Sequence, residues 1–252
     1  MRLYQRARLI ILVFACLIVS SGFSFAQNTD NFPAKRNPAT DLSTEREKSE
    51  IYPKLRDRRC TTMSLDKCNC ADAREMKAYI EALIETGLNK DEIFYRVAKK
   101  FSPNTILDKQ IKAQVEEKLI KDAGGKIPQI VLEPASFNLG RVSKKQGKIV
   151  KVFKLYNKGT EKLIVTNIKV SCSCVTASLS AANNKSPYFG TQGAPLGWEA
   201  IINPGANAEL EVIVDLGHPA INVGKIIRDI NVTSNDIINP EVSVRIEAEA
   251  AD

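Results

Sequence analysis

The sequence predicts an α+β multidomain protein in which a small helical bundle, a helical hairpin plus a spacer helix, precedes an antiparallel β-sandwich. The main observation is a change of hydrophobic period. Apolar residues recur at helical spacing between about residues 71 and 125, and at a period of two from Pro128 onward. The chain has 252 residues, 44% apolar and 26% charged, which is enough for one large or two ordinary domains.

The first 26 residues have the pattern of a cleaved secretory signal. Three arginines precede an apolar run over residues 9–19, and small residues then lead to Ala26. The run is too short to span a bilayer comfortably, which takes roughly 20 residues. We therefore expect export and cleavage after Ala26. An uncleaved anchor is the alternative, and a lipid-modified Cys16 fits the pattern less well.

The net charge argues against nucleic-acid binding, and the cysteine count points to a leftover thiol. Removing the three arginines of the leader lowers the formal charge from +7 to +4, and charges of both signs are mixed along the rest of the chain. Nucleic-acid binding therefore has no support, and we predict no nucleic-acid partner. Five cysteines remain in a compartment where disulfides persist, so at least one thiol is left over.

Residues 27–57 are predicted to be a flexible linker. The segment is polar, contains three prolines and has few large apolar side chains. Such a composition buries too little surface to offset the entropy lost on ordering.

Residues 58–125 are predicted to form the helical domain. Two amphipathic helices make its hairpin, with inward-facing residues at Met76, Ile80, Leu83 and Ile84 in the first and at Ile93, Val97 and Phe101 in the second. Gly87 ends the first helix, and Asn89, with Glu92 three residues later, caps the second. The stretch DKQIKAQVEEKLIKDAGG is a third helix with a narrow apolar stripe, either a spacer or a helix packed on the hairpin.

Residues 128–250 alternate as strands do. In EVSVRIEAEA, Val242, Val244, Ile246 and Ala248 share one face, and AELEVIVD repeats the pattern. About seven such strands in about 120 residues predict an antiparallel β-sandwich. Residues 179–200, which include the only tryptophan, Trp198, are predicted to be a long loop; a surface excursion is favoured over a functional loop.

Six short motifs in this region resemble a known family. FNLGRV, FKLYNKG, LIVTNIKVSCSCV, INPGANAELEVIVD, GHP and RDINVTSND occur in this order. They resemble an exported bacterial family of unknown function with an immunoglobulin-like domain, akin to the major-sperm-protein and HYDIN-type modules. The resemblance implies an immunoglobulin-like sandwich and no activity.

The helical part resembles a second family. CNCADAREMKAYIEALIETGLNKDEIFYRVAKKFSPNTIL is similar to the thiol-bearing three-helix domain of CcmH, the cytochrome c maturation component that handles apocytochrome cysteines before haem attachment. The resemblance implies a periplasmic protein that handles client thiols. The family's working pair is C-x-x-C after Leu-Arg, whereas this chain has Cys60, Cys68 and Cys70.

Cys60, Cys68 and Cys70 are the candidate catalytic thiols. Cys68 and Cys70 lie at the start of the first hairpin helix, where unpaired N–H groups favour a thiolate, while Asp66 and Asp72 oppose it. Three interpretations stay open: a structural bridge from Cys60 to one of the other two, thiol exchange with a client, or a metal site. A zinc site needs a fourth ligand, which the sequence does not supply nearby.

Cys172, Cys174 and His218 are the candidate binding residues of the second domain. In a regular strand the two cysteines lie about 6.6 Å apart with parallel Cβ vectors, so they do not bridge without a local kink. Two such thiols can bind a soft metal or accept a partner's cysteine, but a place in the core or a structural bridge is the favoured interpretation. His218 is the natural third ligand if a metal binds, or else a loop histidine hydrogen-bonded to backbone.

The predicted function is that of a periplasmic accessory protein which assists thiol handling or assembly of exported, c-type cytochrome-like proteins. The alternative is a non-catalytic envelope scaffold whose cysteines are all structural. No phosphate-binding loop, G-x-S-x-G, H-E-x-x-H or C-x-x-C-H motif occurs, and no cofactor is predicted. If the protein is an enzyme, the expected activity is thiol–disulfide exchange, and the expected partners are exported client proteins or apocytochrome-like thiols and a membrane protein.

Overall fold

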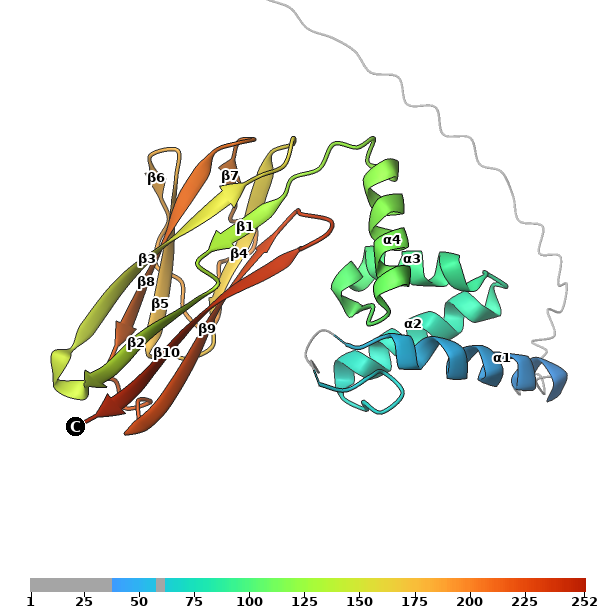
Figure 1. Ribbon diagram of the computed structural model, residues 1–252, viewed down its shortest axis with the longest axis horizontal. Helices are drawn as coiled ribbons and strands as arrows, with labels where there is room; N and C mark the ends of the chain where they lie inside the picture. The colour runs from blue at the N-terminus through green and yellow to red at the C-terminus, as the bar shows by residue number, and fades with distance from the viewer. Residues whose placement is uncertain (1–37, 58–61) are drawn as a thin grey trace, which may run out of the picture. The chain divides into compact units, whose positions relative to one another are not determined.

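The computed structural model of the chain describes residues 38–57 and 62–252 (Figure 1). The predicted signal peptide, its cleavage after Ala26 and the alternative lipid site at Cys16 lie outside the described residues. So does the candidate thiol Cys60.

The helices come first along the chain. They are α1 Pro38–Ile51, η1 Tyr52–Lys54, α2 Ala71–Glu85, α3 Lys90–Phe101, η2 Pro103–Thr105 and α4 Lys109–Asp122. The predicted hairpin corresponds to α2 and α3. None of the helices within residues 38–57 and 62–252 combines the length and the apolar character needed to cross a membrane.

The prediction of a flexible linker over residues 27–57 is wrong for its second half, and residues 27–37 lie outside the described part. Residues 38–57 form α1, η1 and an extended segment whose Ile51 and Leu55 are fully buried in the helical core. Lys48 reaches Glu81 of α2 at 3.1 Å. Because α1 is polar almost throughout and only its end is apolar, its ordering comes from packing against α2 rather than from an apolar stripe of its own.

Tyr52 joins this segment to α2 by a hydrogen bond. Its hydroxyl donates to Glu81 at 2.9 Å. Burial, and then the hydrogen bond to the carboxylate, raises the pKa of Tyr52 well above its ordinary value.

The helical hairpin forms as predicted. Asn89 is the N-cap of α3 and accepts from the backbone N–H of Glu92 at 2.9 Å, while Gly87 adopts φ +75° in the turn. The predicted inward residues of both helices are buried: Met76, Ile80, Leu83, Ile84, Ile93, Val97 and Phe101. These contacts make one apolar seam between the two helices.

α4 packs on the hairpin instead of acting as a free spacer. Val115 and Leu119 are buried on it, and the Tyr95 hydroxyl donates to Asp122 at 2.6 Å. That hydrogen bond, with burial second, raises the pKa of Tyr95. Of the two interpretations of the third helix, the structure therefore supports packing.

The strands form two five-stranded sheets. They are β1 Ile130–Glu133, β2 Ser136–Ser143, β3 Lys148–Asn157, β4 Leu163–Val170, β5 Val175–Ala181, β6 Asn184–Lys185, β7 Ala200–Ile202, β8 Asn207–Asp215, β9 Gly224–Ser234 and β10 Glu241–Ala251. The sheet orders are β1-β3-β8-β5-β6 and β2-β10-β9-β4-β7. The predicted helical bundle followed by an immunoglobulin-like sandwich is confirmed.

The alternating residues of the strands build the sandwich core. Val244, Ile246 and Ala248 of β10 are buried, as their spacing predicts, and Val242 is half-buried. The sandwich is not purely antiparallel, because β2 runs parallel to β10. The alternation of a strand shows which side chains face inward but not the direction of the neighbouring strand.

The predicted loop over residues 179–200 is only partly a loop. Leu179–Ala181 complete β5, and β6 pairs with its end. Phe189 is buried, and its ring meets Trp198 edge to face with centroids 4.8 Å apart. Phe189 and Trp198 therefore anchor the segment on the sandwich, while the other residues of 182–199 are exposed or half-buried, as a surface excursion requires.

Candidate functional site

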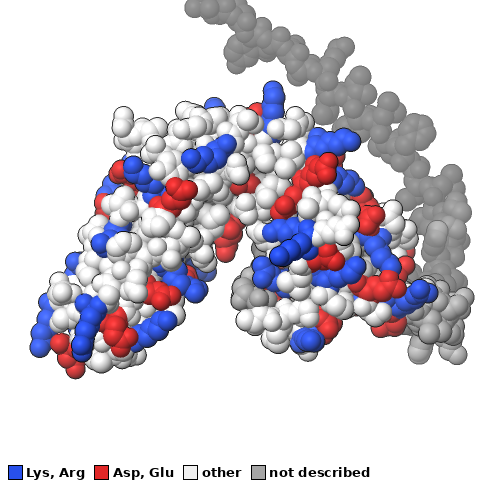
Figure 2. Space-filling view, in the orientation of Figure 1, with Lys and Arg blue, Asp and Glu red and all other residues white. Residues whose placement is uncertain are grey.

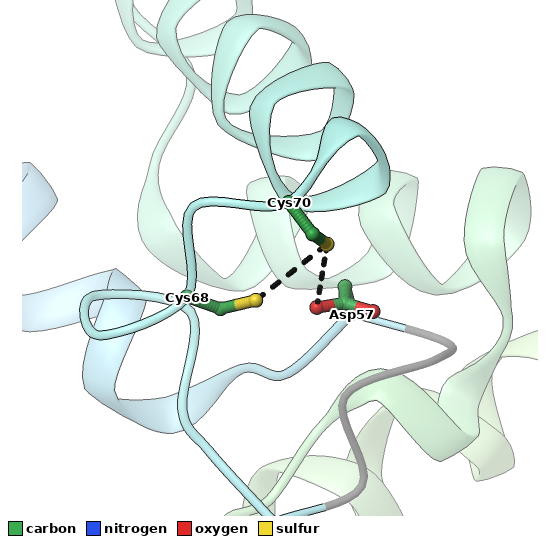
Figure 3. Close-up of side chains that lie close together, drawn as sticks. All are labelled: Asp57, Cys68 and Cys70. Atoms are coloured by element: carbon green, nitrogen blue, oxygen red, sulfur yellow. Dashed lines mark hydrogen bonds between the residues drawn. The ribbon is translucent and has the colours of Figure 1, made fainter.

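Three side chains that offer ligand or proton-transfer atoms meet at the start of α2. Asp57 points toward Cys68 and Cys70 from a separate backbone segment, while the two cysteines lie two residues apart on the stretch that leads into α2 (Figure 3). The Cys68 Sγ lies 3.6 Å from the Cys70 Sγ, and the Cys70 Sγ lies 3.5 Å from the Asp57 Oδ2. All three reactive atoms lie within 4.8 Å of one another.

Cys70 is placed by the helix it begins. It is the N-cap of α2, with an extended backbone, and its Sγ accepts from the backbone N–H of Ala73 at 3.4 Å. Unpaired N–H groups and the positive end of the helix dipole stabilise negative charge at this position. The predicted location of this thiol at a helix start is confirmed.

Cys68 sits in the tight turn before the helix. Its N–H donates to the Ser64 carbonyl at 3.1 Å, and Lys77 of α2 donates to the Cys68 carbonyl at 2.7 Å. Its side chain is 2% exposed, whereas Cys70 is half-buried. An approaching molecule therefore meets the Cys70 sulfur before the Cys68 sulfur.

Asp57 comes from the segment that the sequence indicated as linker. Leu55 pairs with Ile106 as an isolated bridge, and the Leu65 N–H donates to the Leu55 carbonyl at 2.7 Å. These bonds hold Asp57, which is 1% exposed, beside the sulfurs. The only local signal was the apolar pair Ile51 and Leu55, four residues apart, which shows that this stretch joins a core.

The carboxylate at the sulfurs is Asp57, which the sequence did not single out. Asp66, which was expected to oppose a thiolate, is exposed on the turn. The hydrogen bond from the Ser64 side chain lowers the pKa of Asp66. The polar groups at the Cys70 Sγ are therefore the Ala73 N–H at the helix start, which donates to it, and the Asp57 carboxylate, which accepts a hydrogen bond from it.

This arrangement supports two chemistries. Hydrogen bonds run from Cys68 to Cys70 and on to Asp57, so a proton acceptor is in place for the half-buried Cys70 thiol. Two sulfurs and a carboxylate oxygen are also the ligand types that Zn²⁺ prefers, and three protein ligands suffice when the fourth position is open. The metal interpretation thus gains a ligand that the sequence did not supply.

Cys172 and Cys174 are joined by a disulfide, so the regular strand with two separate thiols is wrong here, and of the interpretations left open a bridge is the one found. β4 ends at Val170 and β5 begins at Val175, and the residues between them form a turn. The turn brings the two Cα atoms to 5.3 Å, within the range that a disulfide spans. The turn therefore supplies the local kink that bridging requires. Because both sulfurs are in the disulfide, they do not form a two-thiolate metal site in this structure.

His218 lies in the loop after β8 and bonds to backbone. Its imidazole Nδ1 accepts from the Ala220 N–H at 3.0 Å, and its backbone N–H donates to the Asp215 carbonyl at 3.3 Å. The interpretation of a backbone-bonded loop histidine is therefore confirmed. Arg228, which the sequence analysis did not single out, connects this loop to the disulfide, because it contacts both the Ala220 carbonyl and the Cys174 Sγ.

The sandwich matches a known family model over part of its length. Residues 130–187 match the family described as "Protein of unknown function (DUF1573)". No curated protein is significantly similar to the chain. The sandwich is therefore an immunoglobulin-like domain similar to that family.

Several solved structures are similar to about half of the chain. A protein of unknown function from Porphyromonas gingivalis W83 is 16% identical, with 49% of this chain and 47% of that chain covered and a TM-score of 0.37. The PapD-like domain 7 of human CEP192 is 8% identical, with 50% and 87% covered and a TM-score of 0.31. The YadV chaperone is 12% identical, with 49% and 52% covered and a TM-score of 0.32. The match spans about half the length of the first of these proteins.

Proposed function

We propose that the chain is an exported accessory protein that exchanges disulfides with client proteins through Cys70. The observation that carries the proposal is the geometry at the start of α2. There a half-buried Cys70 Sγ caps the helix, with a second sulfur 3.6 Å behind it. The two sulfurs are not bonded to each other at that distance, since a disulfide bond is about 2.05 Å long.

The exchange proceeds in two steps. The Cys70 thiol gives its proton to Asp57, and the thiolate attacks one sulfur of a client disulfide; the other client sulfur leaves as a thiolate and is protonated. The Cys68 sulfur then attacks the Cys70 Sγ and releases the first client sulfur as a thiol. The client is reduced to a dithiol, and Cys68 and Cys70 are oxidised to a disulfide.

Two sequence features support a periplasmic location and apocytochrome-like clients for this exchange. Residues 1–26 have the pattern of an export signal, and the helical segment resembles the cytochrome c maturation domain of CcmH. We therefore propose periplasmic clients of the apocytochrome kind. The immunoglobulin-like sandwich serves as the module that holds the client or a membrane-protein partner.

The surface gives no single electrostatic preference for such a partner on the face that Figure 2 shows. Lys and Arg side chains alternate there with Asp and Glu. Oppositely charged side chains also form ion pairs, such as Lys118 with Glu92 at 2.8 Å. Client choice is therefore assigned to the thiols and to shape rather than to a field of one sign.

Trapping of a client-like peptide tests the exchange. We expect the Cys68→Ser variant to accumulate a mixed disulfide between Cys70 and a synthetic peptide that carries an oxidised C-x-x-C-H segment, because the second step has lost its attacking sulfur. Intact-mass spectrometry should show the adduct, and peptide mapping should place it on Cys70.

Cys70→Ser is the matched control, since it leaves the same number of cysteines but removes the attacking thiol. It should give no adduct under the same conditions. If neither variant forms an adduct, or if Cys70 resists alkylation in the native protein, the exchange role is wrong and the non-catalytic scaffold interpretation replaces it.

A metal site is the second candidate, because Asp57 adds an oxygen ligand within 4.8 Å of both sulfurs. Zinc bound there would hold Cys70 as an unreactive thiolate. We expect elemental analysis of the protein, purified without chelators, to find about one zinc per chain in that case. Asp57→Asn should weaken zinc binding by about tenfold or more, while Asp66→Asn on the exposed turn should not. Metal-free protein with a reactive Cys70 contradicts this candidate.

A further inference from the structure

The Cys172–Cys174 disulfide presents one accessible sulfur and one enclosed sulfur. Cys172 is half-buried in the turn between β4 and β5, whereas Cys174 is 1% exposed. The Cys174 N–H donates to the Cys172 Sγ at 3.3 Å, and the Cys174 carbonyl accepts from the Asp215 N–H at 2.9 Å. A thiolate approaching from solvent therefore reaches Cys172 first, and Cys174 is the leaving sulfur.

Arg228 is directed at that leaving sulfur. It occupies an inward position of β9, between the buried Ile226 and Ile230, where the alternation of the strand predicts an apolar residue. Its Nε lies 3.0 Å from the Cys174 Sγ. Arg228 is half-buried there, and an arginine beside a sulfur is unexpected at a position whose neighbours in the row are apolar.

No carboxylate of residues 38–57 or 62–252 pairs with Arg228. It donates from Nη1 to the Ile227 carbonyl at 2.8 Å and from Nη2 to the Ala220 carbonyl at 3.3 Å. In the described part of the chain its three hydrogen-bond partners are thus two carbonyls and a sulfur, with no carboxylate among them. A neutral disulfide sulfur is a weak acceptor, but the thiolate formed by its reduction is an anion.

A structural role explains this disulfide poorly. In the chain-entropy account, the stabilisation that a disulfide provides grows with the length of the loop it closes. The two cysteines here are separated by only two positions, so the same formula gives about half the effect of a 15-residue loop.

We propose that the Cys172–Cys174 disulfide is a second exchangeable site, which takes two electrons from a client polypeptide that carries two thiols. A client thiolate attacks the Cys172 Sγ, the Cys172–Cys174 bond breaks, and its electron pair leaves on the Cys174 Sγ beside the Arg228 guanidinium. The second client thiolate then attacks the client sulfur of this mixed disulfide and displaces Cys172. The client ends as a disulfide, Cys172 and Cys174 end reduced, and the two client protons pass to them.

The guanidinium accelerates the first step because it stabilises the departing thiolate, and exchange is faster when the leaving sulfur is the better leaving group. The electron flow is opposite to that proposed at Cys70, and it requires no group of that site. One domain thereby reduces a client disulfide, and the other oxidises a client dithiol.

Reduction of the full-length oxidised protein by excess glutathione tests the proposal. The tryptic peptide Val170–Lys185 contains both cysteines and no other, so mass spectrometry reports this disulfide separately from Cys60, Cys68 and Cys70. We expect the first glutathione adduct on Cys172. We also expect Arg228→Gln to slow the reduction by about tenfold.

Two further variants separate the charge effect from misfolding. Arg228→Lys keeps a cation and should retain most of the rate, whereas Arg245→Gln removes a guanidinium of the same sheet that pairs with Asp229 and should leave the rate unchanged. An adduct on Cys174, or equal rates for Arg228→Gln and the unchanged protein, overturns the proposal. If Arg228→Gln fails to fold, the adduct position in the unchanged protein decides the order of attack, and the Arg228→Lys rate decides the role of the cation.

Discussion

Asn157→Asp should destabilise the sandwich by about 4 kcal/mol, although it changes a single atom type. Asn157 is fully buried at the end of β3, in the motif FKLYNKG. Its Nδ2 donates to the Glu161 carbonyl at 2.7 Å and to the Ile202 carbonyl at 3.0 Å. A carboxylate in the same place has no proton to donate, so a buried negative charge faces two carbonyl oxygens.

The predicted loss in stability comes from the Nδ2 group of Asn157 and not from its Oδ1. This oxygen accepts from the N–H groups of Gln129 and Gly159, at 3.3 and 3.0 Å, and a carboxylate oxygen accepts equally well. The free energy of unfolding can be measured by urea titration, with the fluorescence of Trp198, the only tryptophan, as the probe of the sandwich.

Asn138→Asp is the matched control for this substitution. Asn138 is exposed in β2, and its Oδ1 accepts from the Gly140 N–H at 2.8 Å. We expect a change within about 0.5 kcal/mol, because a solvated carboxylate keeps that bond. A loss of similar size in both variants contradicts the assignment of the effect to the two carbonyls.

The loss in Asn157→Asp should also depend on pH. Burial and the facing carbonyls raise the folded-state pKa of the introduced carboxyl above its unfolded value of about 3.9. The penalty from its ionisation is therefore fully present above the folded-state pKa and fades as the pH falls toward the unfolded value. The difference in unfolding free energy from the parent protein should accordingly shrink between neutral pH and about pH 4.

Phe153→Ala should cost the sandwich about 3–5 kcal/mol. Phe153 lies on the inward face of β3 and is 1% exposed, so truncating it removes apolar contacts and leaves a cavity in a closely packed core. The same urea titration followed by Trp198 fluorescence measures the effect, and the transition midpoint should fall accordingly.

Val152→Ala, one residue earlier on the same strand, provides the control. Val152 faces outward and is 51% exposed, so its truncation should cost less than about 1 kcal/mol. Similar losses at the two neighbouring positions would show that β3 tolerates no side-chain truncation, and the inward face would then not account for the difference.

Most of the elements follow from local patterns. The stripes of α2 and α3, the cap at Asn89 and the inward row of β10 are all found where the spacing places them. These features depend on residues within one or two helical turns or along one strand, so the sequence alone contains the information needed to predict them.

Features that depend on distant segments could not be predicted in this way. α1 is polar and shows no stripe, yet its end enters the helical core through Ile51. The parallel pairing of β2 with β10 joins strands about 100 residues apart, and no local pattern encodes that direction. The disulfide between Cys172 and Cys174 depends on a turn where continuous strand was expected.

By itself the sequence determined the order of a helical bundle and a sandwich, the faces that each element buries, and the location of a thiol at a helix start. Only the tertiary structure decided which groups surround the sulfurs: Asp57 beside Cys70 and Arg228 beside Cys174. The physical reason is the different distance along the chain over which the two kinds of interaction act. Hydrophobic periodicity acts between neighbours in the chain, whereas the charge that controls a sulfur acts across a few ångströms of space, from residues that folding alone brings there.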